Sequence, residues 1–206
     1  ADTGQWIGGD NTDATGLFSV KGLPPGECLV HICPSCSELM YVDETYNDVY
    51  NQSAATRITL TSGSDITIDD IVFATGNTIS GTISGLDPDQ WVHIALNSDN
   101  GTPDGEDDLH FGRGYAADAL GNVEYTITVL PGHLYPVEIY PDGDPRAYYL
   151  AGSPTGTFSW EQATFVNPAS NPIGIDIAVT QGVQLSGIVN GLAEGQRLWI
   201  NARCEN

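Results

Sequence analysis

Short stretches in which apolar and polar residues alternate run along most of the chain, separated by turns rich in Gly and Pro. Such alternation is typical of antiparallel strands that bury one face. It predicts strands at residues 17–20, 27–32, 57–61, 65–73, 78–84, 90–96, 123–129, 135–140, 173–179, 184–190 and 197–202. No stretch shows the period of an amphipathic helix. The sequence therefore predicts an all-β chain of antiparallel strands.

Four sequence blocks occur twice, in the same order and at a nearly constant spacing. In chain order they are DATG at residues 13–16 and DALG at 118–121, LPPG at 23–26 and VLPG at 129–132, ITID at 66–69 and IGID at 173–176, and NTISGTISGL at 77–86 and VQLSGIVNGL at 183–192. We therefore divide the chain into three parts. Residues 1–76 form a first β-sandwich repeat that lacks its opening strands, residues 77–182 a complete second repeat, and residues 183–206 the opening strands of a following repeat.

The end of the chain supplies what its beginning lacks. The strand QWVHIAL at residues 90–96 aligns with QRLWINA at 196–202, and joining the two chain ends would restore a whole repeat. Residues 183–206 could complete residues 1–76 of another copy, of the next period in a longer tandem array, or of the same chain. The first two arrangements run head to tail without closing, which is the condition for a filament.

The first repeat resembles the carboxypeptidase regulatory-like domain over GLFSVKGLPPG at residues 16–26, YVDETYNDVY at 41–50 and ISGTI at 79–83. The second repeat is less similar, because it has an acidic insertion at residues 99–108 and lacks the tyrosine-rich segment. The resemblance implies tandem Ig-like or prealbumin-like (transthyretin-like) antiparallel β-sandwiches, with one domain split between the two chain ends. Members of this family, common in bacterial surface and secreted proteins, are mostly accessory or structural, so the resemblance indicates fold more than function.

The charge of the chain excludes some partners. Six Lys and Arg residues against 27 Asp and Glu give a net charge of −21, which argues against binding to nucleic acid or to anionic membrane surfaces. No apolar run approaches the roughly 18 residues of a membrane-spanning helix, so no membrane insertion is expected. The chain shows no signal peptide and starts at Ala1, which suggests a processed product or part of something longer. We expect an extracellular or cell-surface location, in a bacterium.

The four cysteines, Cys28, Cys33, Cys36 and Cys204, permit two disulfides, with Cys33 and Cys36 closing a tight loop. A zinc site including His31 is the alternative, but zinc ribbons use two separated C-x-x-C pairs, and only one is present. A redox role would place the motif at a helix N-terminus, which the pattern does not predict. We favour structural disulfides and hypothesise that Cys28 of one copy bonds Cys204 of its neighbour.

Two kinds of polar site are candidates for ligands or modification. The insertion has the oxygen-rich, glycine-broken character of calcium loops, with candidate ligands Asp99, Asp104, Glu106 and Asp108. Its spacing departs from the EF-hand pattern, so a solvated hairpin loop is the favoured interpretation, and no other cofactor is expected. Asn51 and Asn100 begin glycosylation sequons, which makes covalent glycans a further expectation.

No motif in the sequence indicates catalysis. The four histidines are isolated, and the chain has no H-E-x-x-H pair, no G-x-S-x-G elbow and no phosphate-binding glycine loop. We therefore expect that the protein is not an enzyme. Among the aromatic residues, Trp91 and Trp199 are expected in a core or an interface, whereas Trp160 and the tyrosines of residues 41–50 are candidate ligand surfaces.

These observations lead to the hypothesis of a structural subunit or repeat of an extracellular head-to-tail filament, held by β-strand complementation between copies of the chain. The expected interface consists of Arg197, Leu198, Trp199 and Ile200 in the C-terminal strand and of Gln5, Trp6 and Ile7 near the N-terminus. The alternative is an accessory glycan- or calcium-binding β-sandwich module of a secreted enzyme or adhesin.

Overall fold

The computed structural model describes residues 5–37, 39–98, 108–172, 174–183, 185–193 and 195–200. Within these ranges the regular structure is β-strand, apart from single-turn 3-10 helices, so the all-β class is confirmed. No helix in this part of the chain is long and apolar enough to cross a membrane. We name residues 5–76 the first unit, residues 77–182 the second unit and residues 183–200 the tail.

The first unit contains β1 (Gly26–Cys28), β2 (His31–Ile32), η1 (Pro34–Ser37), β3 (Glu44–Thr45), η2 (Gln52–Ala54) and β4 (Ile58–Leu60). The second unit contains β5 (Asn77–Ser84), β6 (Trp91–Ser98), β7 (Leu109–Ala116), β8 (Val123–Val129), β9 (Tyr135–Pro141), β10 (Ala147–Tyr148), η3 (Trp160–Gln162), β11 (Phe165–Val166), η4 (Pro168–Ser170) and β12 (Ile177–Ala178). The long strands all belong to the second unit.

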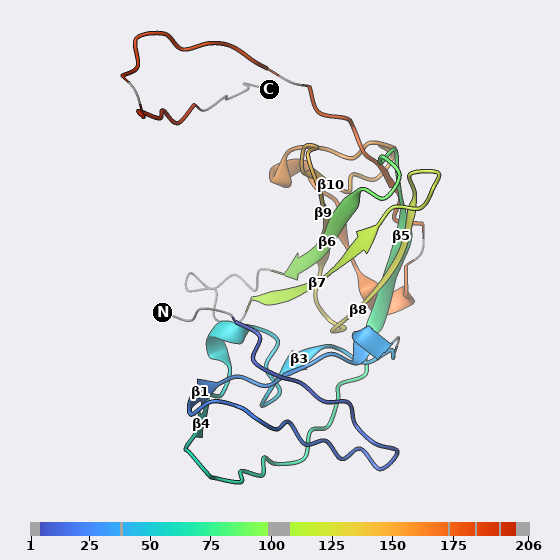
Figure 1. Cartoon of the computed structure of the whole chain (residues 1–206). Helices are drawn as coiled ribbons and strands as arrows, with labels where there is room; N and C mark the ends of the chain where they lie inside the picture. Colours follow the sequence, from blue (N-terminus) through green and yellow to red (C-terminus); the bar gives the residue numbers. More distant parts are fainter. Residues whose placement is uncertain are drawn as a thin grey trace.

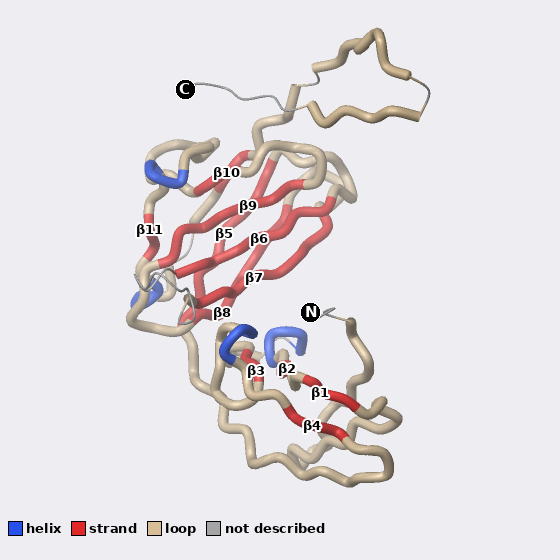
Figure 2. The backbone as a smooth tube through the Cα atoms, turned by 90° about the vertical axis from the view of Figure 1, so that its left-hand side faces the viewer, coloured by secondary structure: helices blue, strands red, loops and turns tan. Residues whose placement is uncertain are grey.

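Two sheets form the second unit, with a sandwich-like core between them (Figures 1 and 2). One sheet has the order β10-β9-β6-β7, with β11 also paired to β9, and the other has the order β12-β5-β8. Pairing is antiparallel except between β12 and β5, which are parallel. Alternate residues of the long strands, among them Ile79, Ile83, Ile94, Leu96 and Ile139, are fully buried between the sheets.

The centre of the smaller sheet depends on one glycine. A Cβ atom added to Gly81, in the middle of β5, would lie 2.2 Å from the carbonyl oxygen of Ile175. The Ile175 N–H group also donates to the Ser80 carbonyl at 3.1 Å. The chain before β12 therefore crosses β5 at a distance that only a glycine permits.

The first unit has much less regular structure than the second. Its ladders are β1 with β4 and β2 with β3, both antiparallel and short. Its buried apolar side chains are Pro34, Val42 and Tyr46, and Val42 packs into the core of the second unit. Such short two-stranded ladders are marginal by themselves, so the first unit lacks a core of its own comparable with that of the second.

Several strand predictions were wrong in a consistent way. Residues 17–20 and 65–73 are not strands, and residues 173–179 contain only the two residues of β12. None of the described residues in 184–190 and 197–202 belongs to a strand. A strand exists only where a neighbour accepts and donates its backbone hydrogen bonds, and these segments lack such a neighbour over most of their length. The prediction also missed β7, whose glycines hide the alternation.

The core of the second unit provides a stability test. We expect Ile94→Ala to lower the free energy of unfolding by about 2–5 kcal/mol, because it leaves a cavity between the sheets. Ile188→Ala in the exposed tail is the control and should change it by less than about 0.5 kcal/mol. Urea unfolding of the monomeric chain measures the free energy of unfolding of both variants. Equal decreases in the two variants would contradict the division into a packed sandwich and an unpacked tail.

Candidate functional site

The first and second units share a turn at the first block of the repeat. In the first unit the Asp13 N–H group donates to the Leu17 carbonyl at 2.8 Å, and in the second unit Asp118 donates to Asn122 at the same distance. The carboxylate of each aspartate also accepts hydrogen bonds from two backbone N–H groups of its own turn. The repeated sequence therefore forms the same local structure in both places.

The strand pairing of the two units is also the same on one side. In the second unit β9 pairs along one edge with β10 and β11 and along the other edge with β6. In the first unit β2 pairs with β3 and β1 with β4, and the pair Cys28–Ile58 corresponds to the pair Tyr135–Val166. No described strand pairs with the other edge of β1 and β2. The first unit has an open edge at the position that β6 occupies in the second.

The tail leaves the second unit with its apolar side chains in solvent. Val183, Leu185, Ile188 and Trp199 are 97%, 87%, 88% and 87% exposed. In both views the tail departs from the end of the sandwich that lies away from the first unit (Figures 1 and 2). Exposed apolar side chains at such density are unusual on a protein surface that has no partner.

The tail already forms the turn that precedes a strand in the second unit. The Gln196 N–H group donates to the Ala193 carbonyl at 3.1 Å, and the Gln196 side chain accepts from the Ala193 N–H group at 3.0 Å. Gln90 makes the same two bonds with Asp87, at 3.0 and 2.7 Å, immediately before β6. Residues 197–200 therefore follow the same turn that precedes the start of β6.

The sequence-predicted interface residues are all exposed. Gln5, Trp6 and Ile7 are exposed near the N-terminus, and Arg197, Leu198, Trp199 and Ile200 are exposed in the tail. The counterpart of Trp6 in the second unit is Phe111, which is buried in the core. The structure does not bring the two groups together within one chain (Figures 1 and 2).

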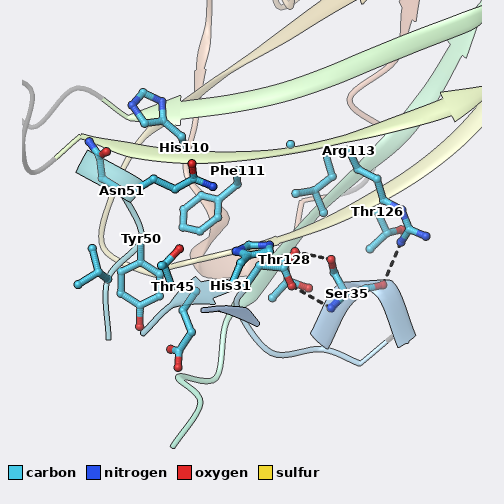
Figure 3. A pocket seen from close by; sticks show the side chains of 16 residues that line it. His31, Ser35, Thr45, Tyr50, Asn51, His110, Phe111, Arg113, Thr126 and Thr128 are labelled. Atoms are coloured by element: carbon cyan, nitrogen blue, oxygen red, sulfur yellow. Dashed lines mark hydrogen bonds between the residues drawn. The ribbon is translucent and has the colours of Figure 1, made fainter. Parts of the chain in front are cut away.

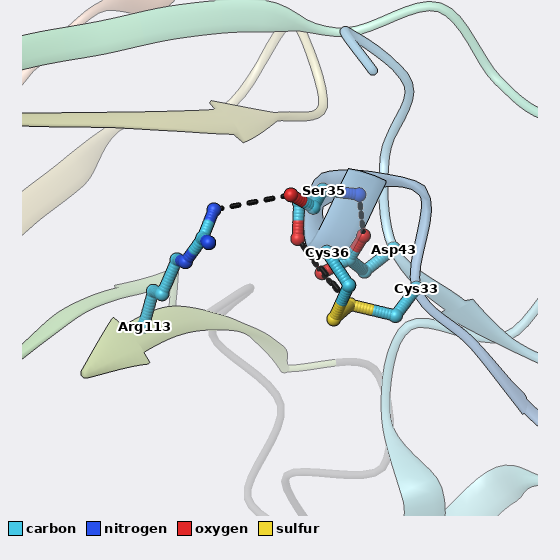
Figure 4. The surroundings of a disulfide bond; sticks show 5 residues. All are labelled: Cys33, Ser35, Cys36, Asp43 and Arg113. Atoms are coloured by element: carbon cyan, nitrogen blue, oxygen red, sulfur yellow. Dashed lines mark hydrogen bonds between the residues drawn. A yellow bond between two sulfur atoms is a disulfide. The ribbon is translucent and has the colours of Figure 1, made fainter. Parts of the chain in front are cut away.

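One predicted disulfide is present. Cys33 and Cys36 are joined with an S–S distance of 2.05 Å at the start of η1 (Figure 4). The Ser35 N–H group between them donates to the Asp43 carboxylate at 2.9 Å, and the Arg113 guanidinium of β7 donates to the Ser35 carbonyl at 3.0 Å. The closed loop thus ties the first unit to the second, and its disulfide is consistent with an oxidising compartment.

Of the other two cysteines, the structure describes only Cys28. Cys28 is a partly buried free thiol in β1, and burial raises the pKa of this thiol. Cys204 lies outside the described residues. A bond between them stays a prediction.

A pocket of about 330 Å³, lined by both polar and apolar side chains, lies where the two units meet (Figure 3). The first unit contributes His31, Thr45 and Tyr50 to its lining, and the second unit contributes Phe111 and Arg113. Tyr50 packs on Phe111 with 6.2 Å between ring centroids. The contact shows that the two units are held together by apolar as well as polar groups.

Glu44 in the wall of this cavity is a buried acid without a hydrogen-bond partner. Its side chain is 2% exposed, and neither carboxylate oxygen accepts a hydrogen bond. Desolvation by burial, together with the nearby negative charge of Asp48, raises the pKa of Glu44. An acid so placed destabilises the folded chain when it is ionised.

The calcium and glycan candidates are only partly within the described residues. Asn51 is half-buried and lines the cavity (Figure 3). Asp108 is half-buried just before β7. Asp99, Asn100, Asp104 and Glu106 lie outside the described residues. In the part of the chain that the structure describes, no group of three or more His, Cys, Asp or Glu side chains is placed to hold a metal ion. Both candidates stay predictions.

The aromatic residues are arranged differently from the prediction. Trp91 is 49% exposed on the outer face of its sheet, with its ring over Gly114, so it does not lie in a core, and its place in an interface stays a prediction. In the tyrosine-rich segment, Tyr46 is buried and Tyr41 stacks on Phe73 at 5.6 Å. Trp160 meets Tyr148 edge-on at 5.6 Å. Packing within the chain therefore accounts for much of these candidate ligand surfaces.

Comparisons with known proteins add no relative: no protein family matches the chain, and neither a curated protein nor a solved structure matches it. The resemblance to the carboxypeptidase regulatory-like domain stays a prediction.

Glu44→Gln tests the buried acid. Because the folded-state pKa of Glu44 is raised, the folded chain binds this proton more tightly than the unfolded chain, and stability falls as the pH rises through the range between the two pKa values. We expect Glu44→Gln to raise the free energy of unfolding at pH 7 relative to the parent, with the difference disappearing at pH 3. Urea unfolding at the two pH values measures it.

Glu124→Gln is the matched control, because Glu124 is exposed on β8. It should change the free energy of unfolding at pH 7 by less than about 0.5 kcal/mol. A Glu44→Gln variant that is less stable than the parent at pH 7 would contradict the assignment of Glu44 as an unfavourably buried carboxylate.

Proposed function

We propose that this protein is a structural subunit or repeat of an extracellular head-to-tail filament, held together by β-strand complementation. One observation carries the proposal: the first unit has an open edge beside β1 and β2, and the tail is an exposed counterpart of the strand that fills this position in the second unit. Main-chain hydrogen bonds and buried apolar side chains would then join each copy to the next.

The direction of the chain supports an open-ended assembly. The first unit and the tail lie at opposite ends of the second unit (Figures 1 and 2). Residues 72–76 lead from the counterpart of β12, residues 70–71, to β5, and residues 179–182 lead from β12 to the tail, so the two connections have similar lengths. If every copy joins the next in this way, each neighbour is related to the last by the same rotation and translation. Such an assembly is an open filament, unless the rotations add up to a full turn and close a ring.

The surface chemistry supports a location outside the cell. The Cys33–Cys36 disulfide favours an oxidising compartment. A net charge of −21 keeps exposed fibres apart and in solution, because like charges repel. Neighbours in the fibre would be separate copies of the chain or successive periods of a longer one.

The outer face of the larger sheet favours a second candidate, an accessory glycan-binding module. Trp91 lies half-exposed there, His93 packs against Tyr140 with 6.1 Å between centroids, and the Arg146 guanidinium lies 4.5 Å from the centre of the Tyr140 ring. Exposed rings beside polar groups suit the faces of sugars. This candidate does not account for the open edge or for the exposed tail.

Removal of residues 192–206 tests the proposal. The shortened chain lacks the counterpart of β6, so we expect it to stay monomeric under conditions in which the full chain forms large assemblies. The second unit should keep its fold, because its core contains no residue of the tail. Light scattering after size-exclusion chromatography measures the mass, and circular dichroism checks the fold. Equal assembly by both chains would contradict the proposal.

The free thiol supplies an independent prediction. Cys204 is the counterpart of Ser98 by the repeat, and Cys28 is the counterpart of Tyr135 by the strand pairing of the two units. The antiparallel register of β6 with β9, continued by two residues, sets the positions of Ser98 and Tyr135 opposite each other. We expect Cys28 and Cys204 of neighbouring copies to lose two electrons and two protons to a disulfide oxidant, which becomes two thiols. A non-reducing denaturing gel should show a ladder of multiples that Cys28→Ser abolishes. The absence of a ladder from assembled wild-type protein would contradict the predicted disulfide between Cys28 and Cys204.

A further inference from the structure

We propose a specific partner and register for this interface. The tail of one copy fills two strand positions in the first unit of a second copy. In the first position Ile200 pairs with Ile32, and in the second position Gly187 lies against the backbone of Ile68. This inference rests on the proposed filament function and adds the pairing that makes the joint specific. The second unit serves as its template, because it contains both positions in their filled form.

The first position is the open edge of β1 and β2. In the second unit Ile94 of β6 pairs with Ile139 of β9 on one side and with Arg113 of β7 on the other. Ile200 is the counterpart of Ile94 by the shared turn at Gln90 and Gln196, and Ile32 is the counterpart of Ile139 by the shared pairing with β3 and β10.

On its other side, the incoming strand meets the exposed N-terminal segment. The turn of Asp13 matches that of Asp118, which makes Gly8 the counterpart of Arg113 and Trp6 the counterpart of Phe111. Trp6 is 75% exposed in the single chain, whereas Phe111 is buried. Completion of the sheet would therefore bury Trp6 against the incoming strand and satisfy both edges of that strand at once.

The second position lies between two segments that the sequence predicts as strands and that the single chain leaves irregular. In the second unit β5 lies between β8 and the segment that runs into β12, and the segments that correspond to these two are residues 17–23 and 66–71. The exposed counterpart of β5 is the first part of the tail, with Gly187 at the position of Gly81. The irregularity of both segments follows from the absence of a strand between them.

Gly187 is a residue on which specificity depends. Within its own chain, a Cβ atom at Gly187 would meet no atom within 4 Å, so nothing in the single chain requires a glycine. At Gly81 the same atom would lie 2.2 Å from the Ile175 carbonyl oxygen, and Ile68 is the counterpart of Ile175. The Thr82 N–H group beside Gly81 donates to the Asp176 carboxylate at 2.8 Å. Ile188 is the counterpart of Thr82 and Asp69 that of Asp176, so the Ile188 N–H group should donate to the Asp69 carboxylate of the second copy.

The course of the chain favours a second copy over the chain's own first unit. Residues 180–182 are all that separate Val179, beside β5, from the start of the tail. Four residue steps reach at most about 14 Å. The counterpart of β5 must therefore begin at the end of the second unit that lies away from the first unit. The strand position that it would fill in its own chain is in the first unit, at the opposite end (Figures 1 and 2).

Gly187→Val in the full chain is the first test, with Ser186→Val as the matched control. Ser186 corresponds to Ser80, which points away from the core, so a valine there fits a strand. We expect Ser186→Val to assemble like the parent and Gly187→Val to remain monomeric, with unchanged unfolding of the second unit. Assembly of Gly187→Val to the same mass as the parent would overturn the proposed register.

Paired cysteines give a second readout that separates the register from the function. In a Cys28→Ser, Cys204→Ser background, the pair Ile200→Cys and Ile32→Cys places thiols on residues directly opposite, with Cα atoms about 4.5–5.5 Å apart, within the range of a disulfide. The control pair, Ile200→Cys and Val30→Cys, is diagonal, about 7–8 Å apart. Treatment with oxidised glutathione should join separate chains through the first pair at least tenfold more than through the control.

Three other results would overturn the inference. Assemblies that crosslink through the control pair would support the proposed filament but show that the proposed register is wrong. A crosslink that forms without an increase in mass would show that the tail folds back on its own chain. A parent chain that stays monomeric would remove the proposed function and the register together.

Discussion

The backbone hydrogen bonds of a β-strand must be made with a neighbouring strand, and this constraint decides the state of the first unit. The second unit satisfies it because β5 and β6 lie in the middle of their sheets. The first unit repeats the flanking elements of that arrangement but contains no described counterpart of either central strand. Its remaining strands pair in twos, its predicted outer strands stay irregular, and its apolar residues find no common core.

The order within the first unit comes from its contact with the second. Val42 packs into the core of the second unit, and Tyr50 packs on Phe111. Arg113 donates a hydrogen bond to the loop that the Cys33–Cys36 disulfide closes. These contacts hold the β2–β3 side of the unit against the sandwich and leave the edge of β1 and β2 open. Glu44, buried without a hydrogen bond at this junction, is a cost that the packing around it offsets.

Sequence reasoning was successful where a strand has its neighbours within the chain. The alternation of residues 78–84, 90–96, 123–129 and 135–140 matched β5, β6, β8 and β9, and the short spacing of Cys33 and Cys36 matched the disulfide. It failed at residues 17–20 and 65–73, because periodicity reports which face a strand would bury and not whether a partner is present. Trp91 does not lie in a core, because Gly114, diagonally across from it on β7, leaves room for its ring on the outer face of the sheet.

The proposed function gives the exposed tail and the open edge one explanation in common, namely that each would complete the other between copies. Negative-stain electron microscopy of the native material, together with its mass on a denaturing gel, tests this explanation most directly. The account predicts filaments with a regular axial repeat, which fall on denaturation and reduction to chains near the 21.9 kDa of this sequence if the copies are separate, or to larger chains if they are consecutive periods. Dispersed compact particles under every condition examined would contradict it.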